Sequence, residues 1–320
     1  MEASLTIVIV NWNGGELLLR CLRSIRASRT SFPVKVIVVD NDSRDGSREA
    51  AQRECPEFNT FNSGSNLGFG RANNLARPLT DTPLVLFLNP DTELKPDTLE
   101  KSVRCLREHP DVGALGCKML YPDGTVQQQG IQWHLTPWRV FVEMMLVTRD
   151  TRGRLARWLP ILNPTQSSYV CKLYGGYVLG RKEVLDRAGW FDERYFMYAE
   201  DADLSRTIGS LGWKLYYTAE TEIIHVSGGT SGKAPSSFSV LMKQESTSKL
   251  MRKYHGVIGA LGYRAAIFVG AAMRLIVLCL LRLVVLVRPR QLPGRISASL
   301  VNQKLILLWA LGLSKPVVAP

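Results

Sequence analysis

The sequence predicts an α/β fold with a mainly parallel sheet flanked by helices, followed by a helical region that is both apolar and cationic. Two observations support this prediction. Short β-branched runs alternate with segments of helical spacing, which is typical of βαβ units. Residues 251–320 hold ten Lys and Arg and no Asp or Glu, whereas residues 1–250 hold 30 basic and 28 acidic side chains. We therefore expect one α/β domain over 1–235 and a C-terminal region over 236–320.

The expected elements follow one another in a regular order. Apolar runs predict strands at 4–11, 34–40 and 82–88, and apolar residues at helical spacing predict helices over 16–28, 47–55 and 71–77. A glycine-containing strand and a helix are expected within 173–190, a helix starting in 198–206, and a late strand ending at His225. The apolar and basic stretch within 118–170 is less regular, and we interpret it as a variable insert near the mouth of the site.

Polar side chains recur where the predicted strands end. They are Asn11, Asn13, Asp40, Asp42, Asn89 and Asp91. In open α/β sheets, ligands bind beyond the carboxyl ends of the strands, so these residues predict a binding site at one edge.

Each of these motifs also has a plainer interpretation. Asp40 and its neighbours suit a helix-capping loop, or a carboxylate that accepts hydrogen bonds from a base or ribose. Asp91, after Pro90, suits a turn, or a ligand for a hard divalent cation that bridges phosphate oxygens. His225 ends a strand and suits a structural role, or contact with a metal or phosphate.

The glycine-rich stretch "NLGFGRANN" at 66–74 lacks the spacing of a dinucleotide fingerprint and the Lys of a P-loop. Gly68 and Gly70 are expected to permit close backbone approach before a helix, whose N-terminus also favours an anion.

The stretch "YAEDADLSR" at 198–206 places three carboxylates within four positions. A solvated helix face with one ion pair would explain Asp203 and Arg206. It does not explain Glu200 beside Asp201, behind a run of aromatic residues. Like charge and apolar rings raise the proton affinity of a carboxylate, as a general base requires.

The six cysteines form no C-x-x-C pair, which predicts free thiols in a reducing compartment. The N-terminal apolar run has six residues and no basic segment before it, so it predicts a strand and not a signal peptide. We therefore expect the α/β domain to lie in the cytoplasm.

The order of the motifs resembles the family 2 inverting glycosyltransferases of the GT-A fold, and among them the rhamnosyltransferase-like subgroup. The motifs are "IVIVNWNG", "VIVVDNDSRDGS", "NLGFGRANN", "LFLNPDTEL", the stretch from "GGYVLGRKEV" to "YAEDADLSR", and "HVSGG". They span about residues 4 to 232.

The resemblance implies a role for each motif. Nucleotide contacts would come from Asn11, Asn13, Asp40, Asp42, Asn66 and Gly68. Asp201 would be the catalytic base with Glu200 in support, and Asp91 and His225 would bind Mg²⁺ or Mn²⁺. Acceptor binding or structural support would come from Gly175, Gly176, Asp203 and Arg206.

The sequence departs from the family pattern at two places. Asn89 stands at the first Asp of the D-x-D motif, so metal binding depends more on Asp91. Cys171 and Lys172 stand where many relatives have an acidic–aromatic pair, which leaves donor and acceptor specificity open.

The resemblance implies transfer of a sugar from a nucleotide-sugar donor, dTDP-rhamnose, to a lipid-linked glycan acceptor carried on a polyprenyl diphosphate. A UDP-sugar donor, a polyprenyl-phosphate acceptor, a sugar nucleotidyltransferase and a non-catalytic sugar-nucleotide sensor remain alternatives. No nucleic acid partner is expected, because aromatic residues are not interleaved with the basic ones. The oligomeric state is open, a homo-oligomer included.

The C-terminal region predicts an amphipathic helix lying on an anionic membrane surface. Its longest uncharged run within 257–287 is 265–273, too short to span a bilayer. One cationic stripe is expected along it, formed by Lys253, Arg264, Arg274, Arg282 and Arg288. A helical cap packed on the α/β domain or on a second copy, and a tilted spanning hairpin, are the alternatives. The expected location is peripheral, at the cytoplasmic face of the membrane.

Overall fold

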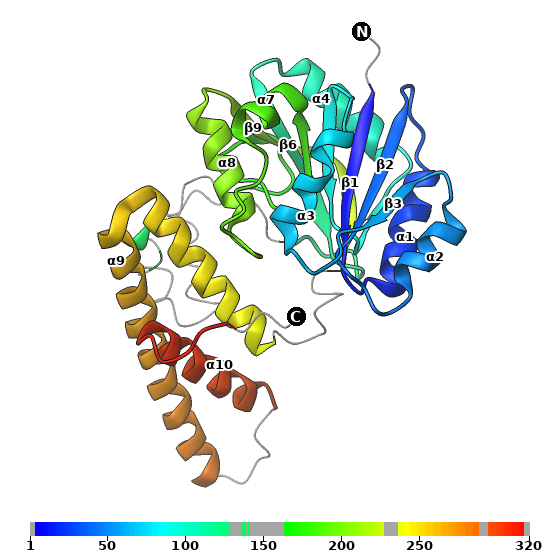
Figure 1. The fold of residues 1–320 in the computed structure, drawn as a ribbon. Coiled ribbons are helices and arrows are strands. Elements are labelled where there is room, and N and C mark those ends of the chain that lie inside the picture. The colour runs from blue at the N-terminus through cyan, green and yellow to red at the C-terminus, as the bar shows by residue number, and fades with distance from the viewer. Residues whose placement is uncertain are drawn as a thin grey trace. The chain divides into compact units, whose positions relative to one another are not determined.

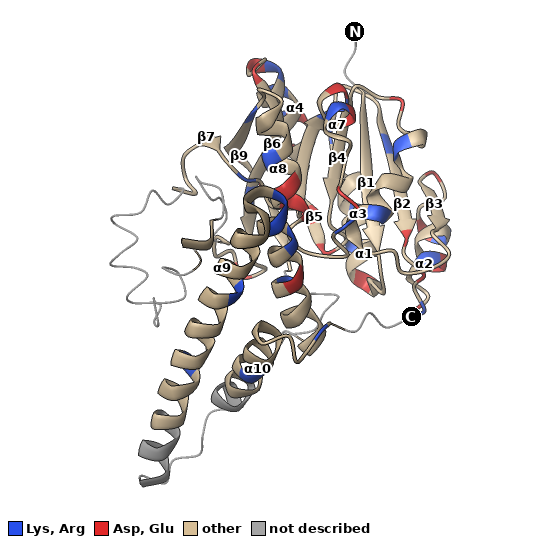
Figure 2. Cartoon of the chain, turned by 60° about the vertical axis from the view of Figure 1, so that its left-hand side comes forward, with Lys and Arg blue, Asp and Glu red and all other residues tan. Residues whose placement is uncertain are grey.

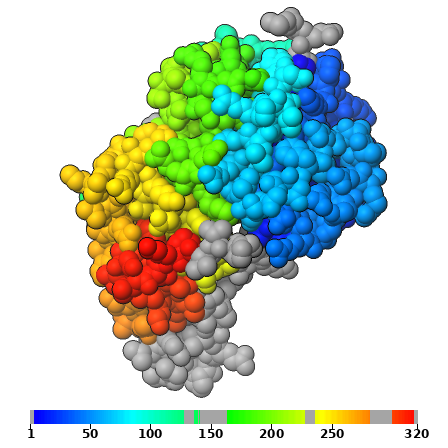
Figure 3. Space-filling view, in the orientation of Figure 1, coloured from blue at the N-terminus to red at the C-terminus, as the bar shows by residue number. Residues whose placement is uncertain are grey.

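The computed structural model describes residues 4–127, 136–138, 140, 163–226, 236–287 and 294–316. The chain divides into two compact units. The first holds the described residues up to 127 and from 163 to 226, and these two parts lie side by side on the face shown in Figure 3. The second holds the remaining described residues. Most of the predicted insert lies outside the described residues.

The described part of the first unit forms one nine-stranded sheet (Figure 1). Its strands are β1 (Leu5–Asn11), β2 (Val34–Asp40), β3 (Asn59–Asn62), β4 (Leu84–Leu88), β5 (Thr92–Leu94), β6 (Val112–Leu120), β7 (Ser168–Val170), β8 (Tyr177–Arg181) and β9 (Lys214–His225). The order is β3-β2-β1-β4-β8-β6-β9-β5, and β7 pairs with β9.

The strand directions confirm a mixed, mainly parallel sheet. β1 runs parallel to β2 and β4, β2 to β3, and β6 to β9. β8 is antiparallel to both of its neighbours, β4 and β6, while β5 and β7 are antiparallel to β9. The carboxyl ends of β1, β2 and β4 therefore meet at one edge, where the sequence places the predicted polar residues.

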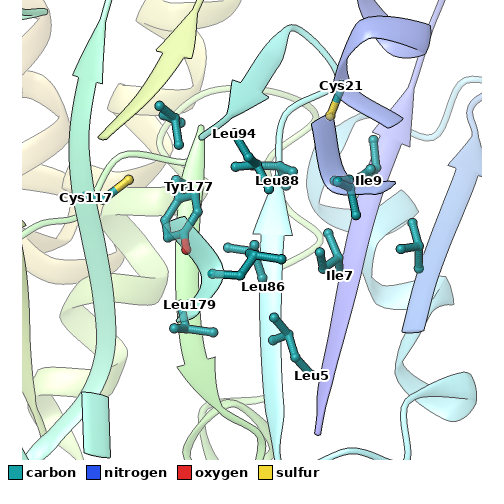
Figure 4. Packing of buried hydrophobic residues seen from close by; sticks show 14 of the residues in the cluster. Leu5, Ile7, Ile9, Cys21, Leu86, Leu88, Leu94, Cys117, Tyr177 and Leu179 are labelled. Atoms are coloured by element: carbon teal, nitrogen blue, oxygen red, sulfur yellow. The ribbon is translucent and has the colours of Figure 1, made fainter. Parts of the chain in front are cut away.

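Helices cover both faces of this sheet. They are α1 (Gly15–Arg26), α2 (Ser47–Glu54), α3 (Phe69–Leu75), α4 (Thr98–Glu108), α7 (Lys182–Ala188) and α8 (Glu200–Ser210), with a 3₁₀ turn at Arg77–Leu79. Alternate residues of β1 enter different cores because successive side chains of a strand point to opposite faces. Leu5, Ile7 and Ile9 pack with α1 and α4 (Figure 4), whereas Val8 and Val10 pack with α3, α7 and α8.

The second unit contains α9 (Ser237–Val287) and α10 (Gly294–Ala310). Non-helical torsions at Gly256 (φ 66°, ψ −165°) divide α9 into two helices. Its core is formed by Val140, Leu241, Met251, Tyr263, Ala266, Ile267, Ala271, Ile306 and Trp309. Val140 belongs to the stretch that the sequence predicts to be an insert near the site, and it packs here with α9 and α10.

The predicted cationic stripe is wrong in part. Lys253 lies before the break at Gly256, so it does not continue the stripe of the helix that follows. Arg264 donates hydrogen bonds to the carbonyls of Trp309 (2.6 Å) and Ala310 (3.3 Å), and its guanidinium lies 4.6 Å from the Trp309 ring centroid. It thus caps the C-terminus of α10, where a cation is favourable. Arg288 lies outside the described residues.

The length and composition of α9 also fit the alternative that the sequence leaves open, a helix that spans the bilayer. Among the described residues, the segment Ser237–Leu280, which the break at Gly256 divides, is long and apolar enough to cross a membrane by length and composition alone, and only 28% of its most apolar stretch is buried. Figure 2 shows Lys and Arg at intervals along α9, between mostly uncharged residues. Isolated charges are tolerated in such a stretch when, like Arg264, they find partners within the protein.

Candidate active site

Two adjacent glycines lie next to both the predicted base and the predicted metal ligands. A Cβ placed on Gly175 would lie 3.7 Å from Cβ of Asp201, and one on Gly176 would lie 3.5 Å from Cε1 of His225. The carbonyl of Gly176 accepts a hydrogen bond from the backbone N–H of Asn89 at 3.2 Å, just beyond β4. The segment before β8 therefore brings carboxylate, imidazole and the end of β4 into one region.

Asp91 and His225 form a buried pair. Nε2 of His225 lies 3.3 Å from Oδ1 of Asp91 and 3.5 Å from Nδ2 of Asn89. Nδ1 of His225 lies 3.0 Å from Oε1 of Gln127, which can only accept a hydrogen bond. Gln127 thus accepts the Nδ1 proton, and Nε2 is the ring nitrogen that faces Asp91.

This pair fits a divalent cation as a partial ligand set. A carboxylate oxygen and a neutral imidazole nitrogen are both ligands for Mn²⁺, and Mg²⁺ accepts one or two carboxylates together with substrate phosphates. No group of three or more His, Cys, Asp or Glu side chains that could hold a metal occurs in the described parts of the chain. The other ligands would have to come from a diphosphate and water.

The turn before α8 is held in an unusual conformation. Tyr198 (φ 66°) and Ala199 (φ 68°) are consecutive non-glycine residues in the left-handed region, which costs about 1–2 kcal/mol per residue. Strain of this kind clusters at functional sites. The turn precedes α8, which begins at Glu200, within the stretch 198–206 where the sequence predicts a helix start.

Glu200 is only 8% exposed, and its Oε2 has no hydrogen-bond partner. Burial, followed by the charge of Asp201, raises the pKa of Glu200 to about 8, although the Lys172 ammonium acts in the opposite direction. The sequence predicts a raised proton affinity for the pair Glu200 and Asp201, and in the structure Glu200 is the residue whose pKa is raised.

Asp201 is paired with Lys172. Its Oδ2 lies 3.2 Å from Nζ of Lys172, and its Oδ1 accepts the N–H of Ala202 at 2.7 Å. Lys172 also lies over the Tyr174 ring, 4.6 Å from its centroid. Burial disfavours the ammonium, but the charges of Asp201 and Tyr174 raise the pKa of Lys172 overall, so it remains protonated. The sequence flags Lys172 as a departure without indicating this partner.

The solvated-face interpretation of Asp203 is wrong. Its side chain is buried and accepts a hydrogen bond from the Tyr195 hydroxyl at 3.3 Å, which ties α8 to the preceding loop. Arg206 is half-buried on the same helix. Ser205 accepts the N–H of Leu173 at 3.1 Å and so fixes the backbone next to Lys172.

Asn11 and Asp40 support a loop at the ends of β1 and β2. Both are fully buried, and Nδ2 of Asn11 donates to Oδ1 of Asp40 at 2.8 Å and to Ser47 at 2.8 Å. Asn13 (φ 51°) and Asp42 (φ 63°) stand on this loop in left-handed conformations and are partly exposed. Their predicted nucleotide contacts stay a prediction, as do those of Asn11 and Asp40.

Asn41 connects this loop to the glycine-rich stretch, a role that the sequence does not indicate. Its Nδ2 donates to Oδ1 of Asn66 (2.9 Å) and to the carbonyl of Gly68 (3.2 Å). A Cβ on Gly68 would lie 2.1 Å from the carbonyl oxygen of Phe196, so the predicted close backbone approach is confirmed. Three loops from distant parts of the chain thus meet at one edge of the sheet.

The mixed sheet and its helices define a GT-A-like fold. A mannosyltransferase, PcManGT from Pyrobaculum calidifontis, solved with GDP-Man and Mn²⁺, is similar with a TM-score of 0.57 at 17% identity, covering 97% of this chain and 88% of that one. GalNAc-T7 solved with UDP, GalNAc and Mn²⁺ is similar with a TM-score of 0.54 at 15% identity, covering 78% and 51%. At such identities the likeness concerns the fold.

The family follows from the sequence comparison. Residues 6–186 match the model of glycosyl transferase family 2, and the chain belongs to this family. It is 30% identical over 265 residues to the N-acetylglucosaminyl-diphospho-decaprenol L-rhamnosyltransferase of Mycobacterium tuberculosis, covering 74% of this chain and 80% of that protein. It is 25% identical over 227 residues to rhamnosyltransferase WbbL of Escherichia coli K12, covering 68% and 82%. The chain is therefore a glycosyltransferase with rhamnosyltransferase-like relatives.

Proposed function

We propose that this glycosyltransferase is a membrane-associated inverting enzyme that transfers rhamnose from dTDP-rhamnose to a lipid-linked diphosphate glycan in cell-envelope polysaccharide synthesis. The activity of the mycobacterial relative, an N-acetylglucosaminyl-diphospho-decaprenol L-rhamnosyltransferase, supports both the sugar and the type of acceptor. One observation carries the reaction type, the position of the Asp201 carboxylate. Asp201 lies beside Gly175, and the next residue, Gly176, lies beside His225.

In the proposed reaction, the Asp201 carboxylate takes the proton of an acceptor hydroxyl. The hydroxyl oxygen forms a bond to the anomeric carbon as the bond from that carbon to the donor phosphate breaks. The electron pair of that bond leaves with the nucleoside diphosphate, and the configuration inverts. Because this is a single displacement, no nucleophilic side chain of the enzyme is required, and Asp201 serves as general base.

Asp91 and His225 would hold Mg²⁺ or Mn²⁺, which would neutralise charge on the departing diphosphate. Gln127 accepts the Nδ1 proton of His225, which would leave Nε2 to bind the cation. Asn13 and Asp42 are the exposed groups of the predicted nucleotide side, while Asn11, Asp40, Asn41 and Asn66 hold the loops that carry them.

The C-terminal unit would keep the enzyme at the cytoplasmic membrane surface. Ile258, Leu261, Phe268, Val269, Met273, Ile276 and Leu280 are exposed at helical spacing along α9, and Ile258 is 85% exposed. An apolar stripe of this size on a chain segment without acidic residues fits a lipid surface. A lipid-linked acceptor would be met at that same surface.

A donor screen tests this function. The full-length protein in detergent would be supplied with Mn²⁺ or Mg²⁺, a lipid-linked acceptor extract, and dTDP-rhamnose, UDP-sugars or GDP-mannose in turn. We expect release of dTDP that requires acceptor and metal. Release of UDP or GDP instead would overturn the choice of donor. No release from folded protein with any donor would contradict the proposed activity.

A further inference from the structure

Lys172 pairs with the one carboxylate that the proposed reaction must protonate. In the free protein the positive charge of Lys172 and the negative charge of Asp201 compensate each other, with Nζ and Oδ2 3.2 Å apart. Both side chains are largely buried, and that of Lys172 is 19% exposed. Once Asp201 has accepted a proton, this balance is lost. A buried cation without a counter-charge is strongly unfavourable, so Lys172 then needs another anion as its partner.

The flexible side chain of Lys172 lets the ammonium change partner while the neighbouring backbone stays fixed. The N–H of Leu173 is anchored on Ser205. A flexible four-carbon stem on a fixed backbone can move its charge by a few ångströms without rearranging β7 or β8.

We propose that the Lys172 ammonium binds the diphosphate that joins the acceptor sugar to its lipid, and so makes the enzyme specific for diphosphate-linked acceptors. This inference rests on the proposed transferase function. The attacked hydroxyl and the diphosphate belong to one molecule, so a base and a cation that touch each other can bind both. When the acceptor enters, its diphosphate replaces Asp201 as the partner of Lys172, and Asp201 is released to accept the proton.

The donor also carries a diphosphate, so the experiment must distinguish binding of the donor diphosphate from binding of the acceptor diphosphate. Asp91 and His225 are suited to the donor diphosphate through a divalent cation. Lys172 instead contacts the residue that takes the proton of the acceptor. The geometry therefore favours the acceptor.

The test compares Lys172→Met with Lys172→Arg, and uses Lys182→Met as a matched control. Lys182 pairs with Asp186 at 2.6 Å within α7 and is also partly buried. Each variant would be assayed with a short prenyl-diphosphate sugar and with an uncharged alkyl glycoside of the same sugar. We expect Lys172→Met to raise KM for the diphosphate acceptor about tenfold or more, and to leave KM for the glycoside and for the donor unchanged. Lys172→Arg and Lys182→Met should keep the wild-type preference.

Three results would overturn the proposal. An equal loss of kcat on both acceptors would mean that Lys172 only positions Asp201. A raised KM for the donor would assign Lys172 to the donor diphosphate. A KM for the diphosphate acceptor that stays at the wild-type value in Lys172→Met would mean that another group binds the diphosphate.

A binding measurement separates this inference from the transferase function itself. Calorimetric titration of the donor-free protein with the prenyl-diphosphate sugar needs no turnover. Weaker binding by folded Lys172→Met than by Lys182→Met would support the site even if no transfer were detected. Equal binding by both variants would contradict it, whatever the activity of the wild type.

Discussion

Glu200 and Asp201 are neighbours in sequence but differ in charge state and partner. Glu200 is buried, with one oxygen lacking a hydrogen-bond partner, and its pKa of about 8 keeps it mostly protonated at neutral pH. Asp201 is paired with Lys172. The repulsion between the two carboxylates that the sequence predicts is therefore relieved by a proton on Glu200 and by the pairing of Asp201 with Lys172. The sequence does not reveal the pairing with Lys172.

The raised pKa of Glu200 predicts how stability depends on pH. The folded protein keeps this proton up to about pH 8, whereas an unperturbed glutamate loses it near pH 4.5. Between these values the unfolded chain binds fewer protons, so the contribution of Glu200 to the free energy of unfolding falls as pH rises. We expect Glu200→Gln to gain stability relative to wild type by ~1 kcal/mol or more from pH 5 to pH 8.

Denaturant unfolding of both proteins at pH 5 and pH 8 measures this difference. Glu183→Gln is a suitable control because Glu183 lies in the first turn of α7 and is exposed. A stability difference between Glu200→Gln and wild type that is the same at both pH values would contradict the raised pKa.

Single residues of the site were predictable where a motif carries them. The motif order indicates Asp91, Asp201 and His225; Asp201 lies beside Gly175, His225 beside Gly176, and Asp91 beside His225, while their roles stay a prediction. Gln127 and Lys172 were not predicted as partners. Each meets its partner across a long stretch of sequence, 98 residues for Gln127 and His225, so no local periodicity or spacing records the contact.

At the scale of elements, the candidate site depends on loops that touch through their backbones. Gly68 (φ 79°, ψ −179°) adopts a conformation that is essentially restricted to glycine, and its Cα faces the Phe196 carbonyl. Phe69 donates its N–H to the same carbonyl at 2.8 Å. This contact holds the glycine-rich loop against the turn that leads into α8.

Gly68→Ala should therefore destabilise the protein through both torsional strain and collision with Phe196. We expect a loss of ~2 kcal/mol or more in the free energy of unfolding, together with weaker donor binding. Gly124→Ala is the matched control, because Gly124 has a similar φ of 81° and nothing within 4 Å of an added Cβ. If both variants lose the same stability in thermal unfolding, the close contact at Phe196 contributes nothing.

Long elements with strong patterns were predicted well, and short or inverted ones were not. The apolar runs of β1, β2 and β4 and the starting point of α8 agree with the structure. β5 and β7 have three residues each, which is too short for a recognisable pattern. The antiparallel direction of β8 between β4 and β6 depends on strand order, which is a tertiary property that no run of residues encodes.

At the scale of the whole molecule, charge and exposed apolar surface are concentrated in the C-terminal region. The excess of ten positive charges lies in residues 251–320. Part of that charge stabilises the contact between α9 and α10, since Arg264 of α9 caps the C-terminus of α10. The exposed apolar residues of α9 then remain as the surface available to a bilayer.

Charged substitutions on this surface test membrane association. Ile258→Glu combined with Leu261→Glu should reduce flotation of the full-length protein with vesicles containing anionic phospholipid about tenfold or more, because each buried apolar side chain contributes ~1.5–3 kcal/mol. Both residues are exposed, so folding should be retained. Leu79→Glu, at an exposed leucine of the first unit, is the control. Unchanged flotation of the double variant would contradict docking through α9.

The central claim, that Asp201 is the base of a sugar transfer, is tested most directly by single-turnover transfer in Asp201→Asn. Asparagine keeps the size of the side chain but cannot take a proton from the acceptor hydroxyl. We predict a rate lower by about 10²–10⁴-fold, with the Kd for the donor nucleotide unchanged and the fold intact. A transfer rate within a few-fold of wild type would show that another group, or none, accepts the proton, and would contradict the account.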